Sequence, residues 1–374
     1  MIKILFLIHD LGPGGAEKVL VNLVNNMDKK LFDITVMSLF GGGINEQFLS
    51  RDVKYQVIYK KTFPMNSHVL KIFSPRRLHK AFIREKYDIE VSYLEGPSAR
   101  IISGCPNKDT KLVSWIHVEQ HNRKTAAGSF RSFRESVACY HRFDTIVTVS
   151  DSVRCDFQSI YPGLADLKVL YNTIETEKIL SLMNEEVSDT LFLEEEFKIC
   201  GVGKIVPVKG FMKLARIHKR LIDQGYPVHT YILGEGAERF RIEKYIKDRG
   251  LEETFTFLGY QLNPYKYVAK CDVFVCTSSA EGFSTAATEA IIVNTPVITT
   301  QVSGMKELLG EDPCGVICDF DETSIYKALE EWILNPETKD FYKHKTKNRA
   351  NLFSQKQTVK QVEGFLYSLN NEQE

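Results

Sequence analysis

Two glutamates in the segment from Ser278 to Ala290 could bind a phosphorylated sugar. Glu281 lies in a turn after an apolar run, and Glu289 lies in the Ala-rich stretch from Ser284 to Ile292, for which the pattern predicts a helix. The first turn of such a helix offers unpaired N–H groups and a positive dipole end to a phosphate. Because carboxylates accept hydrogen bonds from vicinal hydroxyls, the pair suggests a sugar-nucleotide site. For isolated glutamates, a helix-flanking acid and a solvated helix residue would be the simpler interpretation.

A second segment, residues 198–211, supplies positive charge in the same half of the chain. A strand predicted to end at residues 201–203 leads through a loop containing Pro207 to a helix that begins near Gly210. Lys204 and Lys209 flank this loop, and their ammonium groups could offset the charge of a diphosphate. Two loop lysines alone are usually only solvated. Together with the Glu281 segment, they complete the cationic part of one predicted site.

The first half has two weaker candidates. The run from Gly12 to Glu17, which includes Gly15, follows the first predicted strand and precedes a helix, so its glycines could let the backbone approach a ligand. A tight structural turn explains these glycines equally well. His117 ends a predicted strand at the carboxyl edge, where open α/β sheets bind ligands. A hydrogen-bonded structural histidine is the competing interpretation.

Potential metal ligands are better explained without a metal. His121 follows His117 by four residues, but a turn is expected there instead of a helix. Asp319 and Asp321 form a D-x-D pattern, yet Asp321 directly precedes a predicted helix and suits its N-cap. The eight cysteines include no C-x-x-C pair, so their spacing indicates neither a zinc site nor a disulfide framework. We therefore predict no metal in the site and no cofactor beyond a donor substrate.

Length and charge restrict the class of protein. A chain of 374 residues suggests two domains, and the 48 basic and 48 acidic side chains leave no net field to attract nucleic acid. The apolar run at the N-terminus is too short for a signal peptide or a membrane span. A reducing cytoplasm is the simplest setting. The stretch Lys60–Lys86 mixes basic and apolar residues, which suits either an anionic membrane surface or a solvated helical face.

The order of predicted elements indicates an α/β protein with two similar doubly wound halves. We expect an N-terminal domain over residues 1–175, a C-terminal domain over 176–354 and a C-terminal helix over 355–374 that either packs back on the first domain or caps the second. A cleft should separate the domains. The strands predicted with these domains are residues 4–8, 34–37, 89–93, 112–116 and 145–149, then a strand from residue 199, 230–233, 254–257, 273–275 and 296–299.

In this order the motifs resemble the retaining glycosyltransferases of family 4, whose GT-B fold has two Rossmann-like domains facing across a cleft. The resemblance covers essentially the whole chain. It rests on Gly14–Glu17, His117, Gly203–Gly210, Leu233–Gly236, Phe257–Gly259, Glu281–Phe283 and Glu289.

The resemblance implies metal-independent transfer of a hexosyl or N-acetylhexosaminyl group from a nucleotide diphosphate sugar, with UDP as the expected nucleotide. It implies catalytic roles for His117, Lys209 and Glu281. Donor-binding roles would fall to Gly15, Lys204, Tyr260, Gly282, Phe283, Ser284, Thr285 and Glu289. Two departures are Lys204, where arginine is frequent, and Ser284–Thr285, which replaces a commoner Gly- or Pro-containing step.

The acceptor implied by the resemblance is a glycan or lipid-linked molecule in cell-surface polysaccharide synthesis, at the inner face of the cell membrane. Two alternatives stay open. A sugar-nucleotide epimerase has a similar two-domain fold, and a non-catalytic partner subunit could retain the fold and bind glycan.

Overall fold

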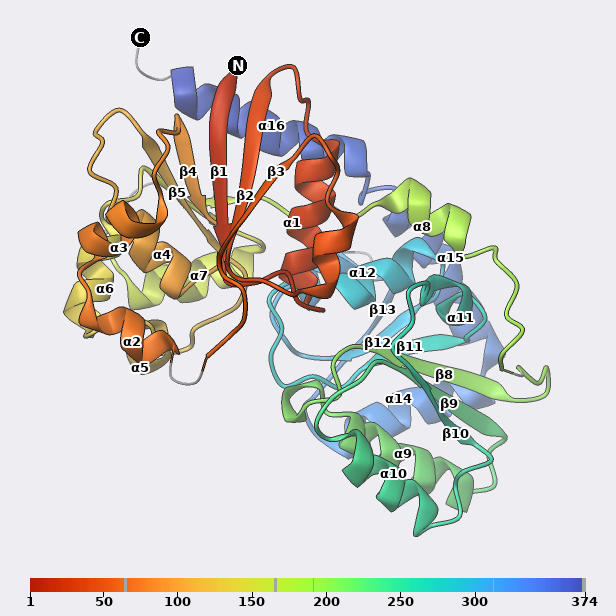
Figure 1. Ribbon diagram of the computed structural model, residues 1–374. Helices are drawn as coiled ribbons and strands as arrows, with labels where there is room; N and C mark the ends of the chain where they lie inside the picture. The colour runs from red at the N-terminus through yellow and green to blue at the C-terminus, as the bar shows by residue number, and fades with distance from the viewer. Residues whose placement is uncertain (64–65, 165–166, 191, 312, 372–374) are drawn as a thin grey trace. The chain divides into compact units, whose positions relative to one another are not determined.

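The computed structural model describes residues 1–63, 66–164, 167–190, 192–311 and 313–371. The chain forms two compact units. The first contains residues 1–173 and 356–374, and the second contains residues 174–355. Each unit is a parallel sheet with helices on both faces (Figure 1). The predicted fold class, two Rossmann-like doubly wound α/β domains, is confirmed.

The first unit has seven parallel strands in the order β3-β2-β1-β4-β5-β6-β7. Its central strands are buried on both faces, as β1 illustrates, where every residue except Lys3 is buried. Continuous apolar runs of this kind are typical of parallel sheets covered on two sides. The strands are β1 (Ile2–Ile8), β2 (Phe32–Phe40), β3 (Lys54–Tyr59), β4 (Ile89–Ser92), β5 (Lys111–Ile116), β6 (Thr145–Thr148) and β7 (Leu167–Val169).

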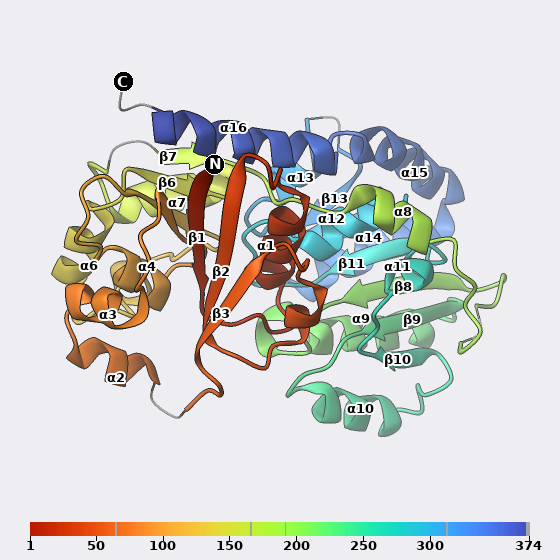
Figure 2. The ribbon, with the colours of Figure 1, turned by 45° about the horizontal axis from the view of Figure 1, so that its top comes forward.

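Most helices of the first unit connect these strands, and one further helix comes from the C-terminal end of the chain. The helices are α1 (Gly15–Asn26), the 3-10 turn η1 (Ile44–Phe48), α2 (Asn66–Ile72), α3 (Pro75–Phe82), α4 (Pro97–Ile102), α5 (Arg123–Ala126), α6 (Phe133–Tyr140), α7 (Asp151–Ile160) and α16 (Gln355–Asn371). The last of these returns to the first unit and lies beside β7 (Figure 2). Lys168 on β7 stacks over the Phe365 ring, and Glu363 accepts a hydrogen bond from the Asp28 amide.

The second unit has six parallel strands in the order β10-β9-β8-β11-β12-β13. The strands are β8 (Phe197–Val202), β9 (Val228–Leu233), β10 (Phe255–Gly259), β11 (Val273–Cys276), β12 (Val297–Thr300) and β13 (Gly315–Cys318). The helices are α8 (Thr176–Leu182), the 3-10 turn η2 (Pro207–Lys209), α9 (Phe211–Asp223), α10 (Arg239–Lys247), α11 (Tyr265–Val268), α12 (Thr285–Ile292), α13 (Met305–Leu309), α14 (Glu322–Leu334) and α15 (Pro336–Ala350).

The core of the second unit forms between the sheet and its amphipathic helices. Leu214, Ile217 and Leu221 of α9 recur at helical spacing and are buried against the strands. Trp332 of α14 is buried in the same cluster. No helix of the described residues combines the length and hydropathy needed to cross a bilayer.

Candidate active site

The strand order of the second unit places three of the predicted site residues at the point where its sheet changes winding direction. In the second unit the chain passes from β8 outward through β9 to β10, then returns to the other side of β8 at β11. Open α/β sheets bind ligands outside the carboxyl ends of strands at such a switch point. The loop after β8 carries Lys204 and Lys209, and the loop after β11 carries Glu281.

Backbone and side-chain hydrogen bonds hold these two loops together. The Thr277 hydroxyl donates to the Lys209 carbonyl at 2.9 Å, and the Ser279 amide donates to the Val208 carbonyl at 2.8 Å. Gly210 begins the turn into α9 at φ +69°, and an added Cβ would lie 2.3 Å from the Thr277 carbonyl oxygen. Because only glycine tolerates both conditions, the approach of the loops depends on Gly210.

Lys209 and Glu281 meet at this junction. Lys209 Nζ lies 2.6 Å from Glu281 Oε1, and the Ser278 hydroxyl donates to the same carboxylate oxygen at 2.7 Å. The Glu281 side chain is 11% exposed and the Lys209 side chain 25% exposed, so both keep access to solvent. The pair therefore presents an ammonium and a carboxylate, already oriented, to a ligand at the switch point.

The backbone after Glu281 leads into the start of α12. Ser284 is the N-cap residue, and its hydroxyl oxygen accepts from the Ala287 amide at 3.4 Å. Thr285 is the first helical residue, and Gly282 and Phe283 are buried. Gly304, at φ +72°, lets the next loop approach, since an added Cβ would lie 2.5 Å from the Gly282 carbonyl oxygen. The structure thus places Gly282, Phe283, Ser284 and Thr285 at a helix N-terminus beside Glu281.

Glu289 lies inside α12 and is buried, with 8% exposure, so the interpretation as a solvated helix residue is wrong. The Tyr265 hydroxyl on α11 lies 3.4 Å from Glu289 Oε1. A buried carboxylate needs polar partners, and the tyrosine supplies one. Sequence reasoning missed Tyr265, since nothing in its local pattern distinguishes it from Tyr267 two residues later.

Two predicted donor-binding residues are more open. Lys204 follows β8 and is exposed, and Tyr260 follows β10 with 46% exposure. Both belong to loops at the carboxyl edge of the second sheet. They therefore share an edge with Lys209 and Glu281 without being fixed in the same packed cluster.

In the first unit, His117 follows β5 and lies beside the loop after β4. Its backbone amide donates to Glu95 Oε2 at 3.0 Å, and its ring lies 4.8 Å from that of Tyr93. Burial lowers the pKa of His117 to about 3, so the imidazole is neutral at physiological pH, and burial raises the pKa of Glu95. Within the described residues, His117 Nε2 is buried without a hydrogen-bond partner. A neutral imidazole of this kind can donate one hydrogen bond to a sugar hydroxyl or accept one from it.

The remaining sequence candidates occupy simpler positions. Gly15 is the exposed first residue of α1. Asp321 is the N-cap of α14 and accepts from the Ser324 amide at 2.9 Å, as predicted. His121 lies outside a helix, with φ +60°, and pairs with Glu119 at 3.5 Å. Neither Asp321 nor His121 belongs to the His, Cys, Asp and Glu cluster that could hold a metal among the described residues.

The fold of two Rossmann-like α/β units is that of GT-B proteins. Two family models match in sequence order: "Glycosyltransferase Family 4" over residues 13–178 and "Glycosyl transferases group 1" over residues 183–349. The chain belongs to the family 4-type glycosyltransferases of the GT-B fold.

Similar proteins cover nearly the whole chain. A Campylobacter jejuni relative, N-acetylgalactosamine-N,N'-diacetylbacillosaminyl-diphospho-undecaprenol 4-alpha-N-acetylgalactosaminyltransferase, is 27% identical over 94% of this chain and 96% of its own. The lipopolysaccharide core glycosyltransferase LpsE of Rhizobium meliloti is 22% identical over 85% of each chain.

Solved structures share the fold at low sequence identity. Anabaena HepE in complex with UDP and glucose has a TM-score of 0.76 at 17% identity, covering 98% of this chain and 100% of that chain. Sucrose-phosphate synthase of Thermosynechococcus elongatus has a TM-score of 0.81 at 14% identity, covering 99% of each. The family models and the sequence relatives make the chain a glycosyltransferase, and the Campylobacter and Rhizobium relatives are named for lipid-linked glycan and lipopolysaccharide synthesis.

Proposed function

We propose that this protein transfers an N-acetylhexosaminyl or hexosyl group from a UDP-sugar to a lipid-linked glycan, with retention of anomeric configuration and without a metal ion at the site of transfer. The observation that carries the proposal is the Lys209–Glu281 pair beside the N-terminus of α12. One side chain supplies positive charge for a diphosphate and the other accepts from sugar hydroxyls. A site that bound only a diphosphate, or only a sugar, would not require both side chains.

The proposed donor site extends along α12. Lys204, Lys209 and the N–H groups near Ser284 and Thr285 neutralise the diphosphate, because the helix terminus and the ammonium groups are both positive. Glu281 and the backbone of Gly282 and Phe283 hold the transferred sugar. Buried Glu289 accepts from the ribose hydroxyls, and Tyr260 lies against the base.

The proposed reaction needs leaving-group stabilisation more than a protein nucleophile. The acceptor oxygen forms a bond to the anomeric carbon while the bond from that carbon to the diphosphate oxygen breaks. The acceptor proton passes to the departing phosphate, and Lys209 and Lys204 stabilise its developing charge. Neutral His117 in the first unit orients a sugar hydroxyl, and Gly15 allows close backbone approach.

The choice of donor and acceptor is supported by relatives and by neighbours of the same fold. The name of the Campylobacter relative specifies transfer of N-acetylgalactosamine to a diphospho-undecaprenol-linked sugar. The Anabaena neighbour was crystallised with UDP and glucose. These descriptions belong to those proteins, and they favour a UDP-sugar donor and a polyprenyl-diphosphate acceptor for this chain.

The proposal is tested by incubating the purified protein with a panel of UDP-sugars and a polyprenyl-diphosphate-linked saccharide. We expect transfer that persists in EDTA and an α-linked product from an α-linked donor, read by NMR. Lys209→Ala should lower kcat by roughly 100- to 1,000-fold, the scale of one lost electrostatic contact in a transition state. Lys213→Ala on α9 is the matched control, because that lysine binds the Phe320 carbonyl instead. Equal activity of both variants would contradict the proposal.

The same assays separate the two alternatives. Conversion of the UDP-sugar to its epimer with no acceptor present would indicate an epimerase. Neither transfer nor UDP release with any donor, despite binding of a glycan, would indicate a partner subunit.

We also propose that the turn between α2 and α3 contacts an anionic membrane surface. Ile72 is 70% exposed and Phe73 46% exposed at this turn. The Arg100 guanidinium donates to the carbonyls of Leu70 and Phe73 at 2.8 and 2.7 Å, which fixes the exposed apolar pair in place. Exposed Arg76, Arg77 and Lys80 follow on α3 and suit acidic headgroups.

Vesicle flotation tests this contact. Wild-type protein should bind vesicles containing phosphatidylglycerol and lose most binding in pure phosphatidylcholine. Ile72→Ser with Phe73→Ser should abolish binding, whereas Leu334→Ser, which removes another exposed apolar side chain in the second unit, should not. Equal binding of all three proteins would contradict the assignment.

A further inference from the structure

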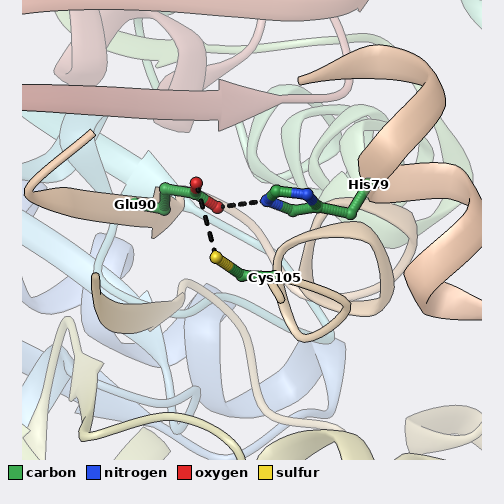
Figure 3. A group of neighbouring side chains, drawn as sticks. All are labelled: His79, Glu90 and Cys105. Carbon is green, nitrogen blue, oxygen red and sulfur yellow. Dashed lines mark hydrogen bonds and ion pairs between the residues drawn. The ribbon is translucent and has the colours of Figure 1, made fainter. Parts of the chain in front are cut away.

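Three buried side chains with metal-binding atoms meet at the start of β4, at the opposite end of this strand from Glu95. His79 comes from α3, Glu90 is the second residue of β4, and Cys105 follows α4 (Figure 3). His79 Nε2 lies 2.8 Å from Glu90 Oε2, and Cys105 Sγ lies 3.7 Å from Glu90 Oε1. One ligand atom from each residue lies within 4.8 Å of the others.

The spacing of these atoms is close to that of a zinc site. Zinc binds nitrogen and carboxylate oxygen at about 2.0–2.2 Å and thiolate sulfur at about 2.3 Å, so tetrahedral ligands lie roughly 3.3–3.7 Å apart. Tetrahedral spacing requires His79 and Glu90 to separate by about half an ångström, and any pair near the 4.8 Å limit to draw together by about one ångström. The Asn107 carbonyl oxygen lies 3.8 Å from Cys105 Sγ and is a candidate fourth ligand.

We propose that His79, Glu90 and Cys105 form a structural zinc-binding site. All three side chains are buried, with no more than 5% exposure, and come from three separate elements. The combination of imidazole, carboxylate and thiol suits Zn²⁺, whereas a sulfur ligand disfavours Mg²⁺ and Ca²⁺. The site is independent of the proposed transfer reaction.

Charge balance favours the metal-bound state in a buried place. With Zn²⁺, a carboxylate, a thiolate and a neutral imidazole sum to zero. Burial penalises net charge strongly, so this state is compatible with the core. The Arg142 guanidinium donates to the Cys105 backbone carbonyl at 2.8 Å.

The occupied site would attach α3 to the sheet. His79 lies on the buried side of α3, and the exposed residues Arg76, Arg77 and Lys80 lie on the same helix. Bonds from three side chains to one metal ion would replace the single His79–Glu90 ion pair. We therefore expect zinc binding to raise the thermal stability of the first unit. Zinc should not be required for sugar transfer.

Metal content of the purified full chain is the first test. After dialysis against equimolar zinc and removal of loosely bound ions, wild-type protein should retain one zinc per chain by mass spectrometry of the metal. Cys105→Ser should retain less than a tenth of this. Cys139→Ser, which changes another buried thiol of the first unit, should match wild type. No retained zinc in wild-type protein, or equal retention in all three proteins, would overturn the proposal.

Cobalt titration covers the case in which Cys105→Ser folds poorly. Co²⁺ should give a thiolate-to-metal charge-transfer band in wild-type protein. Glu90→Gln, a nearly isosteric change, should weaken cobalt binding at least tenfold. Absence of the band in folded wild-type protein would show that the cluster is only a buried ion pair, and the proposal would fail.

Discussion

At the scale of single residues, the candidate site contains two carboxylates, and a neighbouring hydroxyl group holds each of them in place. The Ser278 hydroxyl binds Glu281 at 2.7 Å, and the Tyr265 hydroxyl lies 3.4 Å from Glu289. Both neighbours limit the rotamers of the carboxylate they contact. Fixed rotamers lower the entropy lost when a sugar or ribose binds. We therefore expect these supporting residues to affect donor affinity more than chemistry.

Tyr265→Phe tests this expectation. Removal of one hydrogen bond should cost about 1 kcal/mol, which corresponds to a roughly fivefold rise in the dissociation constant of UDP. Turnover at saturating donor should change little. Tyr267→Phe is the matched control on the same helix, since the Tyr267 hydroxyl binds Asp189 at 2.6 Å.

A double-mutant cycle decides whether Tyr265 acts through Glu289. If it does, Tyr265→Phe should have little further effect on UDP affinity in a Glu289→Gln background. Fully additive losses would show that the tyrosine has only a packing role.

A buried histidine makes the stability of the second unit depend on pH. His218 lies between the hydroxyls of Thr230 and Thr254, at 2.9 Å from each, and burial lowers its pKa to about 3. In the unfolded chain, the His218 imidazole takes up a proton near pH 6.5, whereas in the folded chain it stays neutral down to about pH 3. The free energy of unfolding is therefore highest above pH 6.5 and falls as the pH drops toward 3. At pH 5 this loss should be about 2 kcal/mol for one histidine.

Urea unfolding at pH 7 and pH 5, followed for the second unit, measures this effect. His218→Asn should be less stable at pH 7 but should lose less stability between the two pH values than wild type. His344→Asn, at an exposed histidine of α15, should keep the wild-type pH dependence. An unchanged dependence in His218→Asn would contradict the assignment.

At the scale of elements, the site is a set of strand ends and one helix start. The loops after β8 and β11 are joined by the Thr277 and Ser279 hydrogen bonds, and α12 begins directly after the second loop. A phosphate site at a helix start requires an ordered first turn, because frayed N–H groups no longer converge. The N-cap of α12 should therefore serve both stability and binding.

Replacement of this cap by Ser284→Ala should lower the free energy of unfolding by about 1 kcal/mol. It should also weaken UDP binding several-fold, because the first turn of α12 loses its side-chain acceptor. Asp321→Ala removes the comparable cap of α14 and should lower stability similarly with no effect on UDP binding. Chemical unfolding and calorimetric titration of UDP give the two quantities. An equal loss of affinity in both variants would indicate a global effect instead of a local one.

At the scale of the whole molecule, the chain consists of two units of which the first is closed by a distant segment. The C-terminal helix α16 buries Val362, Leu366 and Leu369 in the first unit. Burial of one leucine side chain contributes roughly 1.5–3 kcal/mol. The last residues of the chain therefore stabilise the unit that begins it.

Leu366→Ala should destabilise the first unit by about 2–5 kcal/mol, since Leu366 is fully buried and its truncation leaves a cavity. Tyr367→Ala, at the exposed neighbouring position, should change stability by less than about 0.5 kcal/mol. Thermal unfolding, with limited proteolysis to identify the unit that opens first, checks both values. Similar melting of the two variants would mean that α16 contributes little to the fold.

Prediction of the fold from sequence succeeded for the interior strands and missed three of the four edge strands. The strands β1, β2, β4, β5, β6, β8, β9, β11 and β12 were all predicted, together with the edge strand β10. The missed strands β3, β7 and β13 all lie at edges. An edge strand is half exposed and can be short, as the three residues of β7 show, so it lacks the continuous apolar run that marks an interior strand.

The sequence by itself determined the α/β class, the two-domain order and the candidate residues of the second unit. Strand, turn and helix signals are local, and Lys209, Gly210, Glu281 and Glu289 stand at fixed offsets from them. Tertiary structure decided which of these side chains meet. Only the pairing of β8 with β11 brings Lys209 to Glu281, 72 positions away, and only helix packing puts the Tyr265 hydroxyl beside Glu289.

The cluster of His79, Glu90 and Cys105 shows most clearly the difference between what local sequence signals predict and what tertiary structure decides. Cysteine spacing along the chain predicts no zinc site, because the three side chains belong to a helix, a strand and a loop with no common local pattern. Folding alone places them within 4.8 Å, since contacts between elements depend on sheet order and helix packing, which short-range sequence signals do not encode.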